Sequence, residues 1–246
     1  MTAVILAAGL GSRLGASGDG APKCLLRFGA TTLIERSIGS LRRAGIRDAI
    51  VVGGYRAAEL EGMLPAPRGL AIRVVRNPRY ATTGSMESLL RAMEVVDDDL
   101  LVLESDILCE ERAISALQRG GRDAILVSAP LDAGDDVYVH ADASGTLRDL
   151  GKGTPKEGAA GALVGICRLS RAFTAHLGRH ARREYAAGHR LGHYEETILS
   201  ASLDGFPIQC VTVPDLAWIE IDTPADLARA RQIVWPEIQR RARGLR

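Results

Sequence analysis

Several features are missing from this sequence of 246 residues, and each absence excludes a class of protein. The cysteines at positions 24, 109, 167 and 210 are far apart and form no C-x-x-C or Cys/His group. This argues against a structural zinc site and indicates a reducing compartment. The apolar N-terminal run is too short for a signal peptide or a membrane span and has no basic residues before it. We therefore expect a cytoplasmic protein that does not bind membranes.

The chain also lacks an excess of charge of either sign. It has 31 basic and 30 acidic residues, for a formal net charge of +1, so no long-range field favours nucleic acid. There is no internal repeat or low-complexity tract, and 46% of the residues are hydrophobic, which is typical of a globular protein. A homodimer is compatible with this composition.

The most informative segment is an apolar run, Ala3 to Ala8, that leads into a glycine loop. A run that is apolar at every position predicts a buried strand. The next residues, Gly9 and Gly11, allow a tight turn whose N–H groups can face an anion. Two cations follow, Arg13 and Lys23, and they can approach the same phosphates. The segment is typical of a nucleoside triphosphate site in which the triphosphate is cut at its α-phosphorus.

Two other phosphate-binding motifs do not match this loop. The dinucleotide pattern G-x-G-x-x-G fails at Leu14, and no acidic residue ends the second apolar run, 49–55, where a ribose-binding carboxylate is expected. The Walker A pattern is absent as well. A dehydrogenase is therefore disfavoured.

Apolar runs alternate with helical patterns along the first half of the chain. We expect strands at 3–8, 49–53, 71–75, 100–104 and 123–129, and helices at 33–44 and 85–95. This rhythm predicts an α/β fold with a doubly wound, mainly parallel sheet. Such a sheet binds ligands at the carboxyl ends of its strands.

The pattern changes after residue 130, where a turn, an alternating strand at 137–140 and a glycine-rich loop at 151–161 follow. We interpret residues 1–234 as one domain. Its nucleotide-binding half is 1–129, and a closing helix covers 225–234. The smaller half, 130–224, is expected to bind the acceptor, that is, the second substrate that reacts with the nucleotide. We expect a basic, frayed C-terminal tail at 235–246.

Two carboxylates end separate apolar strands, Asp106 after Leu101–Ser105 and Asp222 after Trp218–Ile221. They can form a cage for Mg²⁺, which takes one or two protein oxygens beside phosphates and water. The alternative is that each carboxylate caps the following turn or helix. Their in-strand neighbours, Glu104 and Glu220, are expected to lie behind them.

Small polar residues gather before the helix expected at 85–95: Thr82, Thr83, Gly84, Ser85 and Ser88. With the backbone of Ala7 and Ala8 they can contact the edge of a pyrimidine. A plain helix N-cap remains the alternative.

These segments resemble the nucleotidyltransferases that activate phosphorylated small molecules, namely the sugar-1-phosphate nucleotidyltransferases and their cytidylyltransferase relatives. The chain is most similar to the branch that makes CMP-activated phosphocholine or phosphonates such as 2-aminoethylphosphonate. The resemblance runs from Met1 to about Ile233 and includes 80–90, 103–108, 161–166 and 218–224.

The resemblance implies a Rossmann-like nucleotidyltransferase fold and assigns roles to several residues. Lys23 would be the catalytic cation, with Arg13 beside it, and Asp106 and Asp222 would hold the metal. The implied nucleotide-binding residues are Leu6, Ala7, Ala8, Gly9, Gly11, Ser12, Arg13, Lys23, Thr82, Thr83, Gly84, Ser85, Ser88 and Ser105. Relatives carry Asn near 84–85, where this chain has Gly84 and Ser85. Lys152 stands where sugar-nucleotide relatives have a lysine that contacts the acceptor phosphate, and a solvated loop lysine is the alternative.

A cationic acceptor group is predicted from aromatic and acidic residues in the second half. The candidates are Asp136 (with Asp135), Tyr138, Tyr194, Glu195 and Trp218, although ordinary core packing also explains Tyr138 and Trp218. We predict a Mg²⁺-dependent cytidylyltransferase that takes CTP and a small phosphonate or phosphate acceptor. The alternatives are a sugar-1-phosphate or inositol-phosphate nucleotidyltransferase and, more remotely, a non-catalytic nucleotide-binding subunit.

Overall fold

The computed structural model describes residues 1–14, 20–131, 136–152, 156–189 and 192–244. Asp135 lies outside these ranges. The helices of the described residues are α1 (Leu33–Arg43), α2 (Ala57–Met63), α3 (Ser85–Met93), α4 (Arg112–Arg119), α5 (Arg171–Ala186), α6 (Tyr194–Leu203), α7 (Pro224–Arg229) and α8 (Trp235–Gly244), with the short turns η2 (Lys23–Leu25) and η3 (Ala230–Val234). None of these helices combines the length and the apolar composition needed to cross a lipid bilayer.

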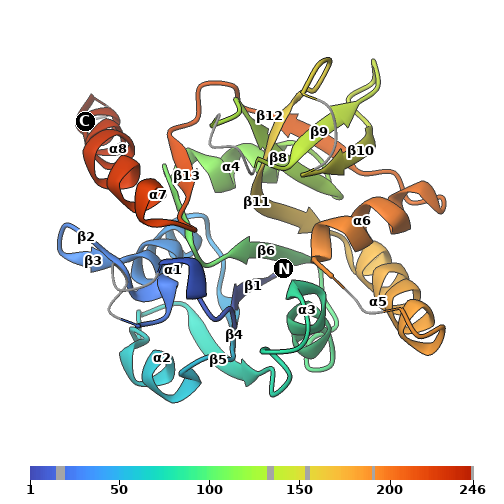
Figure 1. Ribbon diagram of the computed structural model, residues 1–246, viewed down its shortest axis with the longest axis horizontal. Coiled ribbons are helices and arrows are strands. Elements are labelled where there is room, and N and C mark those ends of the chain that lie inside the picture. The colour runs from blue at the N-terminus through green and yellow to red at the C-terminus, as the bar shows by residue number, and fades with distance from the viewer. Residues whose placement is uncertain (15–19, 132–135, 153–155, 190–191, 245–246) are drawn as a thin grey trace.

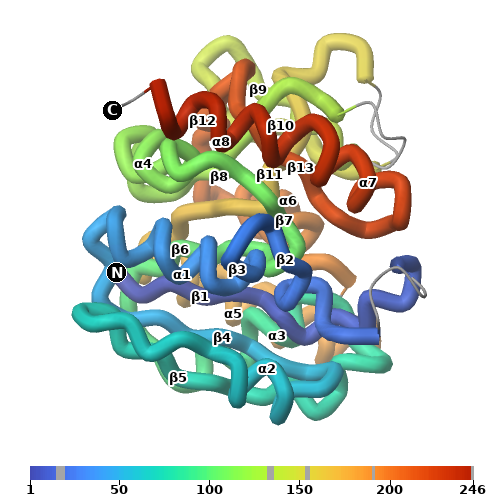
Figure 2. Tube along the Cα trace, turned by 90° about the vertical axis from the view of Figure 1, so that its left-hand side faces the viewer, coloured from blue at the N-terminus to red at the C-terminus, as the bar shows by residue number. Residues whose placement is uncertain are grey.

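The strands are β1 (Thr2–Ala7), β2 (Arg27–Phe28), β3 (Thr31–Thr32), β4 (Asp48–Gly53), β5 (Ala71–Arg76), β6 (Leu100–Glu104), β7 (Ile107–Cys109), β8 (Ala124–Ser128), β9 (Tyr138–Ala141), β10 (Leu147–Gly151), β11 (Gly161–Leu169), β12 (Gln209–Thr212) and β13 (Trp218–Glu220). The main sheet has the order β10-β9-β11-β6-β1-β4-β5, and β8 joins it beside β11. Strands β6, β1, β4 and β5 are parallel. They lie next to one another in Figure 2.

The sheet is covered on both faces, as the uninterrupted apolar strands predict. Along β1 the side chains alternate, with Ala3, Ile5 and Ala7 in the core under α1 and α4 and with Val4 and Leu6 in the core under α3 and α5. Figure 1 shows α1 and α3 on opposite sides of the β1–β6 pair. The predicted doubly wound α/β fold is confirmed.

The second half of the chain extends the same sheet in the antiparallel sense. Strand β11 is antiparallel to β6, β8 and β9, so parallel pairing is confined to the first half and to the β8–β12 pair. A hairpin that turns at Gly145, whose φ is 79°, joins β9 to β10. No linker separates the halves within the described residues, because β11 pairs directly with β6.

The C-terminal segment differs from its predicted frayed tail, because residues 235–244 form α8. The closing helix does not end at 234; α7 continues through the π-helical turn η3 into α8. Val234 and Ile238 are buried with Phe28 and Leu14 in a third core cluster, which gives the helix an apolar face to pack. The sequence prediction weighed the basic residues and overlooked this apolar spacing.

Candidate active site

The glycine loop leaves the carboxyl end of β1 and turns at Gly11, whose φ of 64° favours glycine. The N–H of Leu14 donates to the carbonyl of Gly11 at 3.1 Å. A side chain on Gly11 would bring its Cβ within 3.2 Å of Lys23 Cγ. The glycine therefore lets the stem of Lys23 lie against the loop.

Lys23 begins the turn η2 directly after Pro22 and bridges two carboxylates. Its Nζ donates to Asp106 Oδ2 at 2.9 Å and also to Asp222 Oδ1. Arg13 Nη2 donates to the other oxygen of Asp222 at 2.6 Å. Asp222 is almost fully buried, whereas the Arg13 side chain is 56% exposed. Residues 13, 23, 106 and 222 thus meet at one edge of the sheet, as predicted.

The charges in this cluster hold one another ionised. Burial alone would lower the pKa of Lys23, but Asp106 and Asp222 together raise it well above its ordinary value. Burial likewise opposes ionisation of Asp222, yet Lys23 and Arg13 keep its pKa below the ordinary range. The capping alternative does not account for Asp222, because the box at the start of α7 is formed by Thr223 and Asp226.

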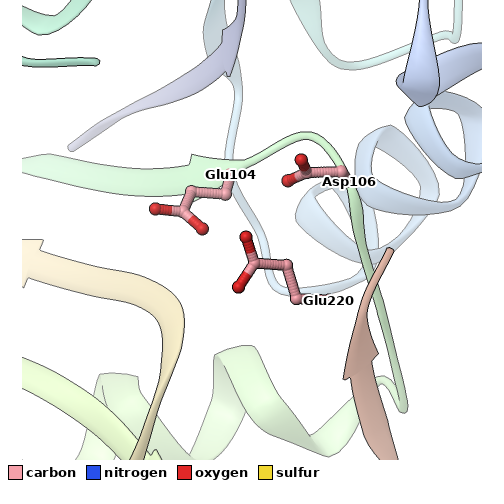
Figure 3. A group of neighbouring side chains, drawn as sticks. All are labelled: Glu104, Asp106 and Glu220. Atoms are coloured by element: carbon pink, nitrogen blue, oxygen red, sulfur yellow. The ribbon is translucent and has the colours of Figure 1, made fainter. Parts of the chain in front are cut away.

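A second acidic group lies beside this cluster. Carboxylate oxygens of Glu104, Asp106 and Glu220 lie within 4.8 Å of one another, and Figure 3 shows Glu104 and Glu220 pointing toward each other. Burial and neighbouring carboxylates raise the pKa of Glu220 to about 8 and that of Glu104 well above its ordinary value. The two glutamates expected to lie behind the site therefore belong to it.

Gly165 makes room for Glu104. A Cβ at Gly165 would lie 2.6 Å from Glu104 Oε2, and its φ is 77°. The register of β11 against β8 shifts between Leu163 and Cys167, so the strand is irregular where it passes the carboxylate. This explains the glycine at the fifth position of the segment 161–166.

A cavity of about 350 Å³ joins these groups. It is lined by the predicted nucleotide-binding residues Leu6, Ala7, Ala8, Gly9, Gly11, Ser12, Arg13, Lys23, Thr83, Gly84, Ser85, Ser88 and Ser105. Thr82, also predicted to bind the nucleotide, is not among the described residues that line the cavity, and its hydroxyl donates to the Arg79 carbonyl at 3.3 Å. Of the three lysines in the sequence, Lys23 and Lys152 line the cavity.

The polar start of α3 faces the cavity, and no side chain caps this end of the helix. Its N-cap is Gly84, which has no side chain to cap with. Ser88 Oγ accepts from Asn77 Nδ2 at 3.1 Å, and both residues line the cavity. The sequence reading missed Asn77, the only asparagine in the chain, because it stands outside the hydroxyl-rich segment.

The starts of α3 and α6 touch. A Cβ at Gly84 would lie 1.9 Å from the carbonyl oxygen of Gly192. The N–H of Tyr194 donates to Ser85 Oγ at 2.9 Å. This contact brings His193 and Glu195, which also line the cavity, beside the polar start of α3. The His193 side chain is exposed.

Glu87 anchors the outer side of α3. Its buried carboxylate accepts from Arg79 at 2.6 Å, from Arg91 at 3.0 Å and from the Tyr185 hydroxyl at 3.0 Å. Burial would raise the pKa of Glu87, but these donors bring it below its ordinary value. The anchor holds segment 77–84 against the cavity.

The predicted acceptor residues divide into two groups. Glu195 and Lys152 line the cavity. Trp218 and Tyr194 are packed in the core, and neither they nor Tyr138 and Asp136 are among the described residues that line it. Core packing accounts for Trp218 and Tyr194, whereas Tyr138 is half-buried and Asp136 accepts from the Leu131 N–H at 3.3 Å.

The donor set suits a divalent cation. Oxygens of Asp106 and Asp222 both reach one cationic atom, Lys23 Nζ, so the two carboxylates can share a single positive charge. Hard carboxylate oxygens are the ligands that Mg²⁺ prefers. Asp106 also belongs to the group with Glu104 and Glu220.

Comparison with known proteins agrees with this geometry. A family model described as the MobA-like NTP transferase domain matches residues 3–176. The chain is 32% identical, over 93% of its length, to a CMP-5'-(3-aminopropyl)phosphonate synthase of Streptomyces rubellomurinus, of which it covers 38%. It is 28% identical to a 2-aminoethylphosphonate cytidylyltransferase of Lancefieldella rimae, over 92% of this chain and 90% of that protein.

The fold has solved counterparts. The structure of the CTP:phosphocholine cytidylyltransferase from Streptococcus pneumoniae superposes with a TM-score of 0.80 at 21% identity, covering 95% of this chain and 98% of that one. The chain thus spans well under half of the Streptomyces relative, but nearly all of the pneumococcal protein.

Proposed function

Since the chain belongs to the family of MobA-like NTP transferase domains, we propose that it is a cytidylyltransferase. It transfers CMP from CTP to a small phosphonate or phosphocholine-like acceptor and releases pyrophosphate. The observation that carries this proposal is Lys23, held between Asp106 and Asp222 next to the glycine loop. The names of the phosphonate and phosphocholine relatives favour CTP and this class of acceptor.

The reaction needs positioning and charge neutralisation more than acid–base chemistry. An anionic oxygen of the acceptor attacks the α-phosphorus and forms a new P–O bond. The bond from the α-phosphorus to the bridging oxygen breaks, and its electron pair leaves with pyrophosphate. Because the attacking oxygen is already ionised, no general base is required.

Each part of the cavity has a role in this proposal. The N–H groups of the glycine loop bind the phosphates, and Lys23 and Arg13 stabilise the charge that develops on the leaving group. Asp106 and Asp222 would hold Mg²⁺, which when bound neutralises and orients the triphosphate. Asn77 and Ser88 lie where a pyrimidine edge can be read.

The acceptor lies on the side formed by residues 130–224. Lys152 lines the cavity there and would bind the acceptor's phosphonate or phosphate. The nucleotide lies on the side formed by residues 1–129, from which the glycine loop and the start of α3 come. The two substrates then meet at the edge where Asp106 and Asp222 converge.

The test is an assay of pyrophosphate release with a panel of substrates. Four nucleoside triphosphates are crossed with 2-aminoethylphosphonate, phosphocholine, inositol phosphate and sugar-1-phosphates, with Mg²⁺ present or chelated. We expect turnover with CTP and a phosphonate or phosphocholine, and none without acceptor or divalent cation. Turnover confined to sugar-1-phosphates would show that these are the acceptors in place of phosphonates and phosphocholine. No turnover in any combination would refute the proposal.

A further inference from the structure

Three glutamates form one wall of the cavity, which we call the acidic wall: Glu104, Glu195 and Glu220. They come from the end of β6, the first turn of α6 and the end of β13, and all three line the cavity. Glu104 and Glu220 lie within the 4.8 Å group described above, and they face each other in Figure 3. The charge of Glu195 acts on Glu104 as well. The repulsion between such carboxylates is relieved when one of them is protonated or when a cation lies among them.

Glu195 supplies an observation that does not depend on the rest of the wall. The residue is 8% exposed, and its Oε2 is buried with no hydrogen-bond partner among the described residues. Its Oε1 lies 3.9 Å from His193 Nδ1, too far for a hydrogen bond. A buried carboxylate oxygen without a donor is costly. Its position at a cavity therefore points to a donor supplied by a ligand.

Lys152 gives the same side of the cavity a positive charge. It lines the cavity and its charge acts on both Glu195 and Glu220. A lysine beside three glutamates matches a small zwitterion, with an anionic group toward Lys152 and a cationic group toward the acidic wall. Neutral hydroxyls would leave the carboxylates without a counter-charge.

The chain places almost no aromatic surface at this cavity. All ten aromatic residues of the sequence are described, because the undescribed segments contain no Phe, Trp or Tyr. Tyr80 alone among them lines the cavity, and its ring packs toward Gly54 near the end of β4, on the nucleotide side. Quaternary ammonium groups have no N–H and are recognised by aromatic cages, whereas a primary ammonium has three donors for carboxylate oxygens.

We propose that the acceptor carries a primary ammonium group, which Glu195 binds with Glu104 and Glu220, so that an aminoalkylphosphonate is preferred over its quaternary counterpart. This inference rests on the proposed nucleotidyl transfer and selects within its acceptor class. Glu195 is the specificity-determining residue, because its buried Oε2 has no other donor among the described side chains.

The experiment compares three acceptors that share one phosphonate: 2-aminoethylphosphonate, its N,N,N-trimethyl analogue and 2-hydroxyethylphosphonate. With CTP and Mg²⁺, we expect kcat/KM for the primary amine to exceed that of each analogue at least tenfold. Glu195→Gln keeps the shape but removes the charge, and a lost charge-assisted hydrogen bond corresponds to about 10- to 100-fold. We expect this loss to appear as a higher KM for the amine acceptor alone, with the KM for CTP and the Mg²⁺ requirement unchanged.

Glu196→Gln is the matched control, since Glu196 is the next residue of α6 and is exposed. It should keep the amine preference. Calorimetric titration of each acceptor onto the CTP-free protein gives a second readout that does not need turnover. Equal kcat/KM for the amine and trimethyl acceptors, or an equal loss for all three acceptors in Glu195→Gln, would overturn the inference while leaving nucleotidyl transfer intact. Absence of pyrophosphate release with every acceptor would refute the proposed function, and this inference with it.

Discussion

Replacing Lys23 by methionine tests the centre of the site, because methionine keeps most of the side-chain volume and removes the charge. Lys23 Nζ is 2.9 Å from Asp106 Oδ2 and also bonds Asp222, and only 14% of its side chain is exposed. A preorganised charge of this kind is worth about 10²- to 10³-fold in kcat, or about 2.7–4 kcal/mol of activation free energy.

The same substitution also has a predicted effect on stability. Removing one partner of a buried ion pair costs up to about 3–5 kcal/mol, but Asp222 keeps its bond from Arg13 and Asp106 is partly exposed. We therefore expect the free energy of unfolding without Mg²⁺ to fall by about 1–3 kcal/mol. Added Mg²⁺ should restore much of this loss, because a cation between the two carboxylates replaces the missing ammonium.

The assay combines single-turnover pyrophosphate release with thermal unfolding in the presence and absence of Mg²⁺. Arg47→Met serves as control, because Arg47 is exposed just before β4, at the amino end of the parallel strands, whereas the cavity lies at their carboxyl ends. A Lys23→Met enzyme that keeps kcat within a few-fold of the parent, while Tm falls, would show that Lys23 is a structural cation only.

Four further substitutions have distinct expected outcomes. Asp106→Asn and Asp222→Asn should each raise the Mg²⁺ concentration needed for half-maximal rate by tenfold or more while the protein still folds, and an unchanged metal titration would remove that residue from the metal site. Gly165→Ala should lower kcat/KM for the acceptor more than for CTP, because its Cβ would meet Glu104 Oε2 at 2.6 Å; equal effects on both substrates would contradict this. Glu87→Gln should destabilise the protein at neutral pH. The folded-state pKa of Glu87 is lowered, so its stabilisation is present above about pH 4.5 and is lost as the pH falls through the folded-state pKa. The urea midpoints of the variant and the parent should therefore converge on acidification. A difference between the midpoints that does not change with pH would contradict the charge argument.

The sequence predicted those parts of the fold whose signals are local. Continuous apolar runs identified β1, β4, β5 and β6, and a helical pattern identified α1, each within one or two residues. Strands β1, β4 and β6 are largely buried, whereas β5 lies at the edge of the sheet and is partly exposed. The C-terminal helix α8 was missed, since its packing depends on Phe28 and Leu14 far away in the chain.

The site was predictable where backbone and charge decide, and not where long-range packing decides. The placement of the glycine loop, Lys23 and Asp106 in one site was predictable, because the carboxyl ends of the strands meet at one edge of the sheet. No local signal separates Trp218, which is buried in the core, from an aromatic residue that lines a cavity. Glu104 has room in the site because Gly165 leaves space beside its carboxylate, and this is a relation between strands that are distant in sequence.

The pairing of Lys23 with Asp106 and Asp222 means that a polyphosphate bound as proposed would meet a cation that already has partners. In the proposed function, binding would be an exchange of counter-ions. Phosphate oxygens would displace the carboxylates from Lys23 and Arg13, and a divalent cation would neutralise the carboxylates. The net affinity would be the difference between two sets of strong interactions, and the carboxylates would pair with Lys23 and Arg13 again when pyrophosphate leaves.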